Sequence, residues 1–241
     1  METLQKPAKE KLPKPPKPPK PKGLALQQLA NKQFSSIESL TPDFISYYGE
    51  IDEALDIIFF GDSSNGKTYA VAALVENLVA IFKCKCNYIS YEEGHGKTMQ
   101  NLLIDQYKLL EKHGNCLTLY EDFTYEQLDY YIQRKQSAKI WVFDSLQASN
   151  LTFEQMELLK HKYVMGKAKK IFIYISWAEG KLPQGAVARS VRYMANIKIR
   201  VEGFIAFIRS RYPNNKRNYV IWEEGAKLYW MKQYKKMLTK K

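Results

Sequence analysis

The chain has 241 residues, with 37 Lys and Arg against 25 Asp and Glu and a formal net charge of +12. This length accommodates one α/β domain of ordinary size plus appendages. No apolar run reaches membrane-spanning length, and the basic N-terminus lacks the apolar stretch of a signal peptide, so we expect a cytoplasmic protein with no membrane partner. The three cysteines are too few for a disulfide scaffold and are expected to be buried thiols.

The charge is unevenly distributed. Residues 1–22 hold seven Lys and two Glu, and residues 227–241 hold six Lys and no acid. Residues 160–217 carry fourteen Lys and Arg against two Glu, whereas residues 23–159 carry ten against nineteen acids. The basic half predicts a polyanion partner, and a solvated basic surface without a partner is the alternative.

The Pro/Lys repeats of residues 1–22 cannot bury apolar area, which predicts a disordered, polyproline-II-like arm. Such an arm would tether DNA, dock on a protein partner or keep the protein soluble. Helical patches are expected next, at residues 24–34 and 43–55.

Strands and amphipathic helices then alternate. The patterns predict strands at residues 57–60, 86–91, 116–120, 139–144 and 171–176, and helices at 67–82, 97–112, 125–136 and 152–165. This alternation is typical of a mainly parallel sheet with helices on both faces. Closely spaced strands are expected at 196–201, 204–210, 218–223 and 227–231, with a hairpin turn at Glu224-Gly225, so the sheet should end in an antiparallel extension.

A G-x-x-x-x-G-K-T motif follows the first apolar strand and opens the first long helix. Its residues are Gly61, Asp62, Ser63, Ser64, Asn65, Gly66, Lys67 and Thr68. A strand, a glycine-bounded loop and a helix N-terminus form a phosphate cradle, in which Lys67 reaches the β- and γ-phosphates and Thr68 offers its hydroxyl to Mg²⁺. The motif predicts a nucleoside triphosphate site; a chance glycine turn is the alternative.

Acidic residues follow two other predicted strands. Asp144 ends the strand 139–144 at the sheet edge where ligands bind, and we expect it to hold Mg²⁺; a helix N-cap is the alternative. Glu92 and Glu93 follow the strand 86–91, which we expect beside the phosphate-loop strand. Glu92 is the expected carboxylate that orients the attacking water, with Glu93 second. Alternatively, both acids simply start the next helix.

The order GDSSNGKT, YISYEEG, IWVFDSLQ, IFIYISWAEGKLPQGAVARSVRYMANIKIRVEG and FIRSRYP resembles the RecA-like ATPase core, closest to RadA-type repair ATPases and DnaB-type ring helicases. The resemblance covers residues 50–212. It implies that Glu92 is catalytic, that Asp144 holds magnesium and that Ser176 is a sensor of the nucleotide. It also implies that Arg209 and Arg211 act on a neighbouring subunit's ATP.

Two positions depart from the pattern of that family. Trp177 stands where His or Gln is usual, and R-S-R-Y-P replaces K-N-R-F-G at the strand that carries the arginines. In the family, the loops after Asp144 and Ser176 face DNA, so Trp177, Lys181 and Arg189 are expected near single-stranded DNA, with Trp177 stacking on a base.

The expected organisation is an arm at residues 1–22, a RecA-like ATPase domain at 23–231 and a basic tail at 232–241. The expected function is a Mg²⁺-dependent ATPase, nucleoid-associated, that oligomerises as a ring or filament on single-stranded DNA in recombination, repair or replication. The alternatives are a P-loop switch or loader that controls a protein partner, suited to the proline-rich arm, and a small-molecule kinase, for which no arginine-rich lid is recognisable.

Overall fold

The computed structural model describes residues 23–32 and 37–239, and the chain divides into two compact units, residues 1–35 and 36–241. The described part of the first unit forms one short helix, α1 (Leu26–Ala30), with no buried side chain. The predicted Pro/Lys arm lies outside the described residues. Everything below concerns the second unit.

One sheet organises the second unit. Its strand order is β3-β2-β4-β5-β1-β7-β8-β9, and β6 pairs with β5 outside this path. The strands are β1 (Leu55–Gly61), β2 (Cys86–Ser90), β3 (Leu117–Tyr120), β4 (Ile140–Asp144), β5 (Ile171–Glu179), β6 (Leu182–Pro183), β7 (Ile197–Glu202), β8 (Ile205–Ser210) and β9 (Asn218–Val220). Pairing is parallel from β3 through β7, and β8 and β9 are antiparallel. The predicted mainly parallel sheet with an antiparallel C-terminal extension is confirmed.

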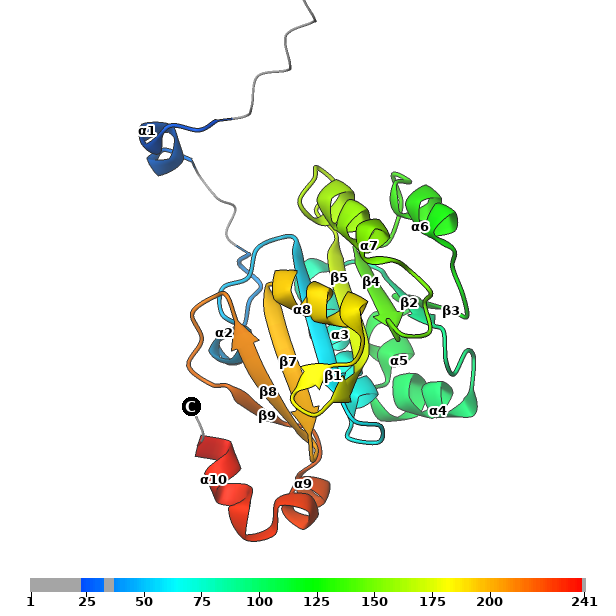
Figure 1. The fold of residues 1–241 in the computed structure, drawn as a ribbon, viewed down its shortest axis with the longest axis vertical. Helices are drawn as coiled ribbons and strands as arrows, with labels where there is room; N and C mark the ends of the chain where they lie inside the picture. The colour runs from blue at the N-terminus through cyan, green and yellow to red at the C-terminus, as the bar shows by residue number, and fades with distance from the viewer. Residues whose placement is uncertain (1–22, 33–36, 240–241) are drawn as a thin grey trace, which may run out of the picture. The chain divides into compact units, whose positions relative to one another are not determined.

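Helices cover both faces of this sheet (Figure 1). The helical segments are α2 (Pro42–Tyr48), α3 (Lys67–Phe82), α4 (Lys97–Gln100), η1 (Asn101–Gln106), α5 (Leu109–His113), α6 (Tyr125–Ile132), α7 (Phe153–Leu159), η2 (Lys160–Val164), α8 (Ala186–Met194), α9 (Glu223–Trp230), η3 (Met231–Gln233) and α10 (Tyr234–Thr239). Residues of α3, α4 and η1 share one hydrophobic core with one face of the central strands, and residues of α6, α7 and α8 share a second core with the other face. Within the described residues, no helix is long and apolar enough to cross a membrane.

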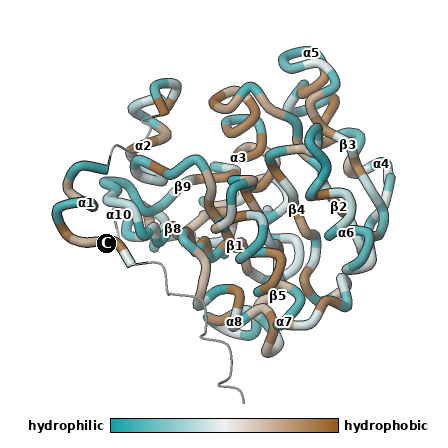
Figure 2. The backbone as a smooth tube through the Cα atoms, turned by 90° about the horizontal axis from the view of Figure 1, so that it is seen from above, coloured by the Kyte–Doolittle hydropathy of each residue, from teal (hydrophilic) through white to brown (hydrophobic). Residues whose placement is uncertain are grey.

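Strand β1 lies at the centre, between β5 and β7, and all seven of its residues are buried. Hydrophobic residues run along the central strands in Figure 2. The polar exception is Asp56, 1% exposed, whose Oδ2 lies 2.6 Å from the Nζ of Lys160. Asp56 and Asn196 also exchange two backbone-to-side-chain hydrogen bonds of 3.1 Å. A buried carboxylate is retained here because it is paired and hydrogen-bonded.

The expected neighbour of β2 was wrong. Strand β2 pairs with β3 and β4, so β4 and β5 separate it from β1. Each of these strands is an apolar run of similar length, so composition alone does not set their order in the sheet. The position of Glu92 and Glu93 therefore depends on the loop after β2 and not on pairing with the phosphate-loop strand.

The strand predicted at residues 227–231 and the hairpin turn at Glu224-Gly225 were also wrong, because residues 223–230 form α9 and Met231 begins η3. Glu223 and Glu224 occupy the first turn of the helix, where acids are favoured by its dipole. Packing requires a glycine at position 225, because a Cβ there would lie 2.2 Å from Cε3 of Trp222. Helix α10 then occupies most of the segment 232–241, and its Met237 is buried.

Two further segments differ in detail from the prediction. The helix expected at residues 97–112 is divided at Tyr107 and Lys108, where Lys108 has φ +52°. Strand β5 extends beyond residue 176 to Glu179 and turns back as β6, so the segment expected as a loop begins as a short hairpin.

Candidate functional site

The loop between β1 and α3 is fixed by close backbone contacts. A Cβ at Gly61 would lie 2.1 Å from the carbonyl oxygen of Val201, so only glycine fits there. Gly66 has φ +91°, a conformation that side chains disfavour, and it is the N-cap of α3. The Asn65 side-chain oxygen accepts a 2.6 Å hydrogen bond from the backbone N–H of Gly203. The loop is therefore held from the side of β7.

The N-terminus of α3 suits an anion. The first N–H groups of a helix have no intrahelical partners, and no side chain caps those of α3. They are therefore available to an anion. The Lys67 ammonium group donates to the carbonyl oxygens of Gly61 at 2.9 Å and Asp62 at 2.8 Å. Burial lowers the pKa of Lys67, and the charges of Asp144, Glu92 and Asp62 oppose that shift. The arrangement places one cation and several N–H donors around the same loop.

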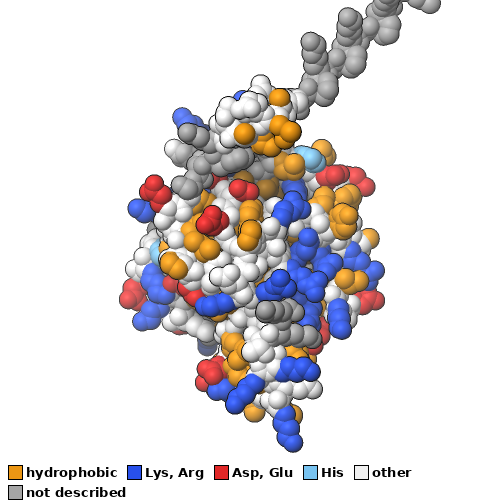
Figure 3. Space-filling model, turned by 90° about the vertical axis from the view of Figure 1, so that its left-hand side faces the viewer, with side chains coloured by type: hydrophobic (Ala, Val, Ile, Leu, Met, Phe, Trp, Pro, Cys, Tyr) orange, Lys and Arg blue, Asp and Glu red, His pale blue; other side chains and the backbone are white. Residues whose placement is uncertain are grey.

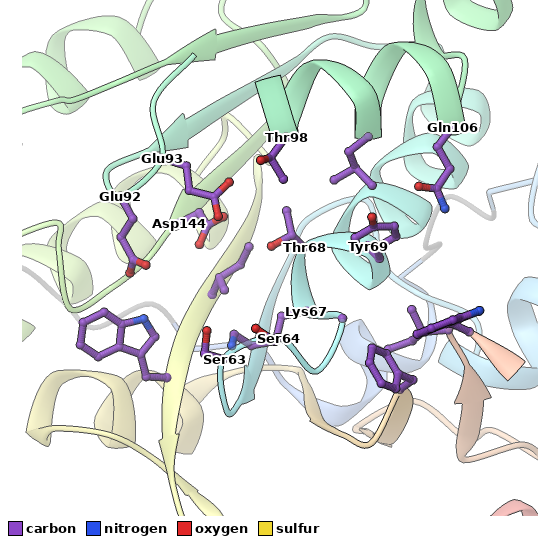
Figure 4. A pocket seen from close by; sticks show the side chains of 17 residues that line it. Ser63, Ser64, Lys67, Thr68, Tyr69, Glu92, Glu93, Thr98, Gln106 and Asp144 are labelled. Atoms are coloured by element: carbon purple, nitrogen blue, oxygen red, sulfur yellow. The ribbon is translucent and has the colours of Figure 1, made fainter. Parts of the chain in front are cut away.

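A cavity of about 620 Å³ opens above this loop, and it brings together most of the predicted site (Figure 4). This volume is within the usual range for small-molecule sites. Its lining residues are Ser63, Ser64, Gly66, Lys67, Thr68, Tyr69, Glu92, Glu93, Thr98, Leu102, Gln106, Asp144, Ile175, Trp177, Phe204, Ile221 and Trp222. The predicted lysine, threonine and three carboxylates thus share one cavity.

The carboxylates gather at one end of the cavity. The Tyr88 hydroxyl donates to Oδ2 of Asp144 at 2.6 Å, and the Ser145 hydroxyl donates to Glu92. Burial raises the pKa of Asp144 to about 6; the Tyr88 hydrogen bond opposes this, and the charges of Glu92 and Glu93 add to it. The negative charges of such a cluster repel one another, and a bound cation reduces this repulsion.

The donors present fit a magnesium ion bound together with phosphate. Thr68 and Asp144 supply hard oxygen ligands, which Mg²⁺ prefers. No group of three or more His, Cys, Asp or Glu residues able to hold a metal occurs among the residues that the structure describes. Mg²⁺ usually takes one or two protein ligands and completes its shell with water and substrate phosphates, and Thr68 and Asp144 would be those ligands here.

Ser176 lies outside the cavity, although its neighbours Ile175 and Trp177 line it. Successive side chains of a strand point to opposite faces, so Ser176 faces away from the loop. Its hydroxyl is fully buried, accepts from Nε2 of Gln147 at 2.9 Å and donates to the Trp177 carbonyl oxygen at 2.8 Å. A sensing role for Ser176 would have to pass through Trp177 or Gln147.

Arg209 and Arg211 are exposed and also lie outside the cavity. Arg209 pairs with Lys198, and the N–H of Arg211 donates to the carbonyl oxygen of Asn196, which is hydrogen-bonded to Asp56 near the start of β1. Gly61 ends β1 five residues later, so Arg211 lies roughly 17 Å from the phosphate loop along the strand direction, at about 3.3 Å per residue. Arg211 is therefore at the opposite end of the strands from the loop of its own chain, and Arg209, opposite Lys198 of β7, lies two strands away from β1.

These arginines belong to a basic strip, defined by Lys198, Arg200, Arg209, Arg211 and Arg192. Figure 3 shows Lys and Arg side chains gathered in one area of this side of the molecule. Burial lowers the pKa of Lys198, and the charges of Arg211 and Arg192 lower it further. The pKa of Arg200 is lowered by burial and by Arg209. Arg200 is also ion-paired with Glu202, so the repulsion that an anion would reduce lies mainly among Lys198, Arg192 and Arg211.

The segment after β5 is only partly as expected. Trp177 is 41% exposed and lines the cavity, and it is the β5 residue that pairs with Gly61 of β1. The Arg189 guanidinium group contacts Glu179 at 2.6 Å and the Pro183 carbonyl oxygen at 3.2 Å. Arg189 is therefore engaged within its own chain, whereas Lys181 is exposed at the turn.

The sequence analysis missed one whole wall of the cavity. Phe204, Ile221 and Trp222 come from the C-terminal strands and the start of α9, and no motif marks them. A second missed set lies on one side of α4 and η1: Thr98, Leu102 and Gln106. Their spacing of four residues was a usable signal, because such residues share one helix face.

Comparison with solved structures identifies the fold. The chain resembles the KaiC-like protein PH0186 from Pyrococcus horikoshii OT3, with a TM-score of 0.54 and 18% identity over 78% of this chain and 94% of the other. It also resembles the flagellar accessory protein FlaH from Methanocaldococcus jannaschii, with a TM-score of 0.51 and 19% identity over 77% and 93%. No protein-family profile matches the chain, and no curated protein sequence does.

The chain therefore has the RecA-like P-loop fold, as the sequence predicted. Identities below one fifth define the fold alone. The special closeness to RadA-type and DnaB-type proteins stays a prediction, as do the roles of the individual site residues.

We expect Asp144→Asn to stabilise the protein in the absence of nucleotide. An aspartate with a pKa of about 6 when folded and 3.8 when unfolded destabilises the folded state as the pH rises through that interval. At pH 7.5 the variant should unfold at a higher temperature. Its free energy of unfolding should exceed that of the wild type by up to about 3 kcal/mol, because the pKa of Asp144 differs by about two units between the folded and unfolded states. Near pH 3.5 the two proteins should unfold alike. Equal melting temperatures at pH 7.5 would contradict the raised pKa.

Proposed function

We propose that the protein is a Mg²⁺-dependent ATPase that oligomerises on single-stranded DNA, with each ATP site completed by a neighbouring subunit. The observation that carries the ATPase part is the cavity in which Lys67, Thr68, Glu92 and Asp144 meet above the phosphate loop. We infer a place for this activity in DNA recombination, repair or replication, and therefore in the cytoplasm at the nucleoid.

Each cavity residue has a role that its chemistry supports. The loop N–H groups and Lys67 bind the phosphates, and Thr68 and Asp144 hold Mg²⁺, which supplies charge neutralisation at the phosphoryl group when bound. The Glu92 carboxylate accepts a hydrogen bond from the attacking water and orients it, and the Ser145 hydroxyl holds that carboxylate in place. Glu93, which also lines the cavity, is the second candidate for this role.

We expect Glu92→Gln to retain ATP binding and to lose turnover by about a hundredfold or more, the usual size of a general-base contribution. Calorimetric titration with ATP and a phosphate-release assay measure the two effects separately. Lys67→Ala is the matched control, because it should lose binding itself. Loss of binding in both variants would assign Glu92 a structural role, and full turnover in Glu92→Gln would move the role to Glu93.

The position of Arg209 and Arg211 supports completion of the site in trans. Neither reaches its own phosphate loop, and both are exposed on the basic strip. An arginine fork supplies fixed positive charge to the transferring phosphoryl group, and donating it from a neighbour makes hydrolysis depend on assembly.

A subunit-mixing experiment tests this arrangement. Lys67→Ala and Arg211→Ala subunits are each expected to be inactive alone, and their mixture should regain a part of the wild-type rate. Rescue follows because some interfaces then combine an intact loop with an intact arginine. Full activity of Arg211→Ala alone, or the absence of rescue at every mixing ratio, would count against a shared site.

The DNA part of the proposal is supported by Lys198 and Arg192 of the basic strip, which repel one another and are left to contact DNA phosphates when Arg209 and Arg211 serve the neighbour's ATP. We expect single-stranded DNA to raise the ATPase rate at 50 mM salt and to lose this effect at about 300 mM, as counterion release predicts. Poly-glutamate of equal charge is the control for a general polyanion effect. The DNA role fails if no stimulation appears at low salt, or if poly-glutamate stimulates equally.

A second candidate function is a nucleotide-controlled switch or loader that acts on a protein partner. It is favoured by the exposed apolar side chains Leu228 and Met231 on the C-terminal helical segment, each 76% exposed. The proline-rich arm at residues 1–22 is another contact that such a partner would use. ATP binding without any response to DNA would favour this candidate.

A further inference from the structure

Aromatic side chains from the C-terminal part of the chain form one wall of the cavity. Phe204 lies in the turn between β7 and β8, and Trp222 precedes α9. Their rings meet edge to face, with centroids 5.0 Å apart and planes at 82°. Both rings line the cavity, yet Trp222 is 50% exposed. A large apolar ring left half exposed at a cavity is a candidate contact for a ligand.

The wall is adjacent to the phosphate loop. A Cβ on Gly66 would lie 3.3 Å from Cγ2 of Ile221 and 3.4 Å from Cδ1 of Phe204, which is van der Waals contact or closer. In Figure 4, Tyr69 and Gln106 lie on the opposite side of Thr68 from Glu92. The cavity therefore has an acidic end at the strand termini and an aromatic end on the other side of the loop.

Hydrogen bonds and close contacts hold the wall in place within the chain itself. The backbone N–H of Ile221 donates to the Phe204 carbonyl oxygen at 2.9 Å, and the Trp222 ring packs on Gly225. The Trp230 indole N–H donates to the carbonyl oxygen of Gly203 at 3.1 Å, and Gly203 in turn donates to Asn65 of the loop. A surface fixed in this way loses little entropy when a flat ligand stacks on it.

We propose that the Trp222 ring, supported edge to face by Phe204, is the platform on which the purine base of the bound nucleoside triphosphate stacks, an inference that rests on the proposed function. With the γ-phosphate at the acidic end, the triphosphate runs along the loop and the nucleoside lies at the aromatic end. Stacking on aromatic side chains tolerates different bases, because every base has a π face.

The same geometry determines how well bases are distinguished. The acids that line the cavity, Glu92, Glu93 and Asp144, all belong to the phosphate end, so none of the described lining residues offers a carboxylate to the base. Gln106 and Tyr69 are polar lining residues on the side of Thr68 away from Glu92. ATP and GTP should therefore bind with affinities that differ only several-fold, and pyrimidine nucleotides should bind more weakly because they stack over less area.

The test compares ATP with inorganic tripolyphosphate, which has the phosphates but no base. Trp222→Ala should raise the Kd for Mg-ATP by about tenfold, the typical size of a lost base–aromatic stack, and leave the Kd for Mg-tripolyphosphate unchanged. Trp222→Phe should keep most of the affinity. Tyr193→Ala is the matched control, because Tyr193 is an exposed aromatic residue, 84% accessible, on α8 and outside the cavity.

Three measurements separate stacking from damage to the fold. Thermal unfolding checks each variant, and Phe204→Leu, which should show the same ATP-selective loss, gives a second probe. In a Trp177→Phe protein, Trp222 is the most exposed of the three remaining tryptophans, since Trp141 is fully buried and Trp230 is half-buried. ATP should therefore lower the fraction of the fluorescence that acrylamide quenches, and tripolyphosphate should not.

The outcomes distinguish the two levels of the proposal. If wild-type protein binds neither ATP nor tripolyphosphate, the proposed nucleotide function fails. If both ligands bind but Trp222→Ala weakens them equally, or weakens neither, the base platform is overturned while the triphosphate site stands. GTP affinity more than about twentyfold below that of ATP would overturn recognition by stacking alone.

Discussion

The site depends on the close approach of β7 to Gly61, where a Cβ would lie 2.1 Å from the carbonyl oxygen of Val201. It allows β7 to continue past the end of β1, so that the turn after β7 arrives beside the phosphate loop. Asn65 then binds the N–H of Gly203 and fixes the loop to that turn. A side chain at Gly61 would separate the two segments and open one wall of the cavity, and a side chain at Gly203 would displace Tyr229 and Trp230 of α9.

The two ends of the cavity come from different parts of the sheet. Strands β2 and β4 deliver the carboxylates on one side, and the turn after β7 and the start of α9 deliver aromatic rings on the other. At the opposite end of β1, the Asp56 side chain contacts Lys160 and Asn196, and Asn196 directly precedes β7. The loop is thus positioned by a strand anchored at both of its ends.

Local patterns in the sequence were sufficient for the parts of the fold that one segment determines. Helix α3 begins at Lys67 and ends at Phe82 as predicted, because a glycine loop and an apolar helix are local features. Lys67, Thr68 and Asp144 converge because parallel strands end at a common edge. The order of the strands was less accessible, since β2, β4 and β5 are all apolar runs and pairing depends on contacts between distant segments.

The C-terminal part of the chain escaped prediction for another physical reason. Tyr229 and Trp230 suggested a strand by propensity, yet their rings pack over Gly203, and this tertiary contact favours a helix there. The aromatic wall was invisible to motif reasoning because Phe204 and Trp222 meet only after the antiparallel strands have formed. Residues that come together only through contacts between distant segments have no characteristic spacing in the sequence.

The central position of β1 has a consequence for synthesis of the chain. Its two partners begin at Ile171 and Ile197, so β1 emerges from the ribosome about 115 residues before the first of them. At about 5–20 residues per second, this delay is roughly ten seconds, during which an apolar β segment has no native neighbour. Such segments associate with one another when exposed. The acids around the strand, Asp52, Glu53 and Asp62, place like charges at both of its ends and so oppose pairing between two nascent chains.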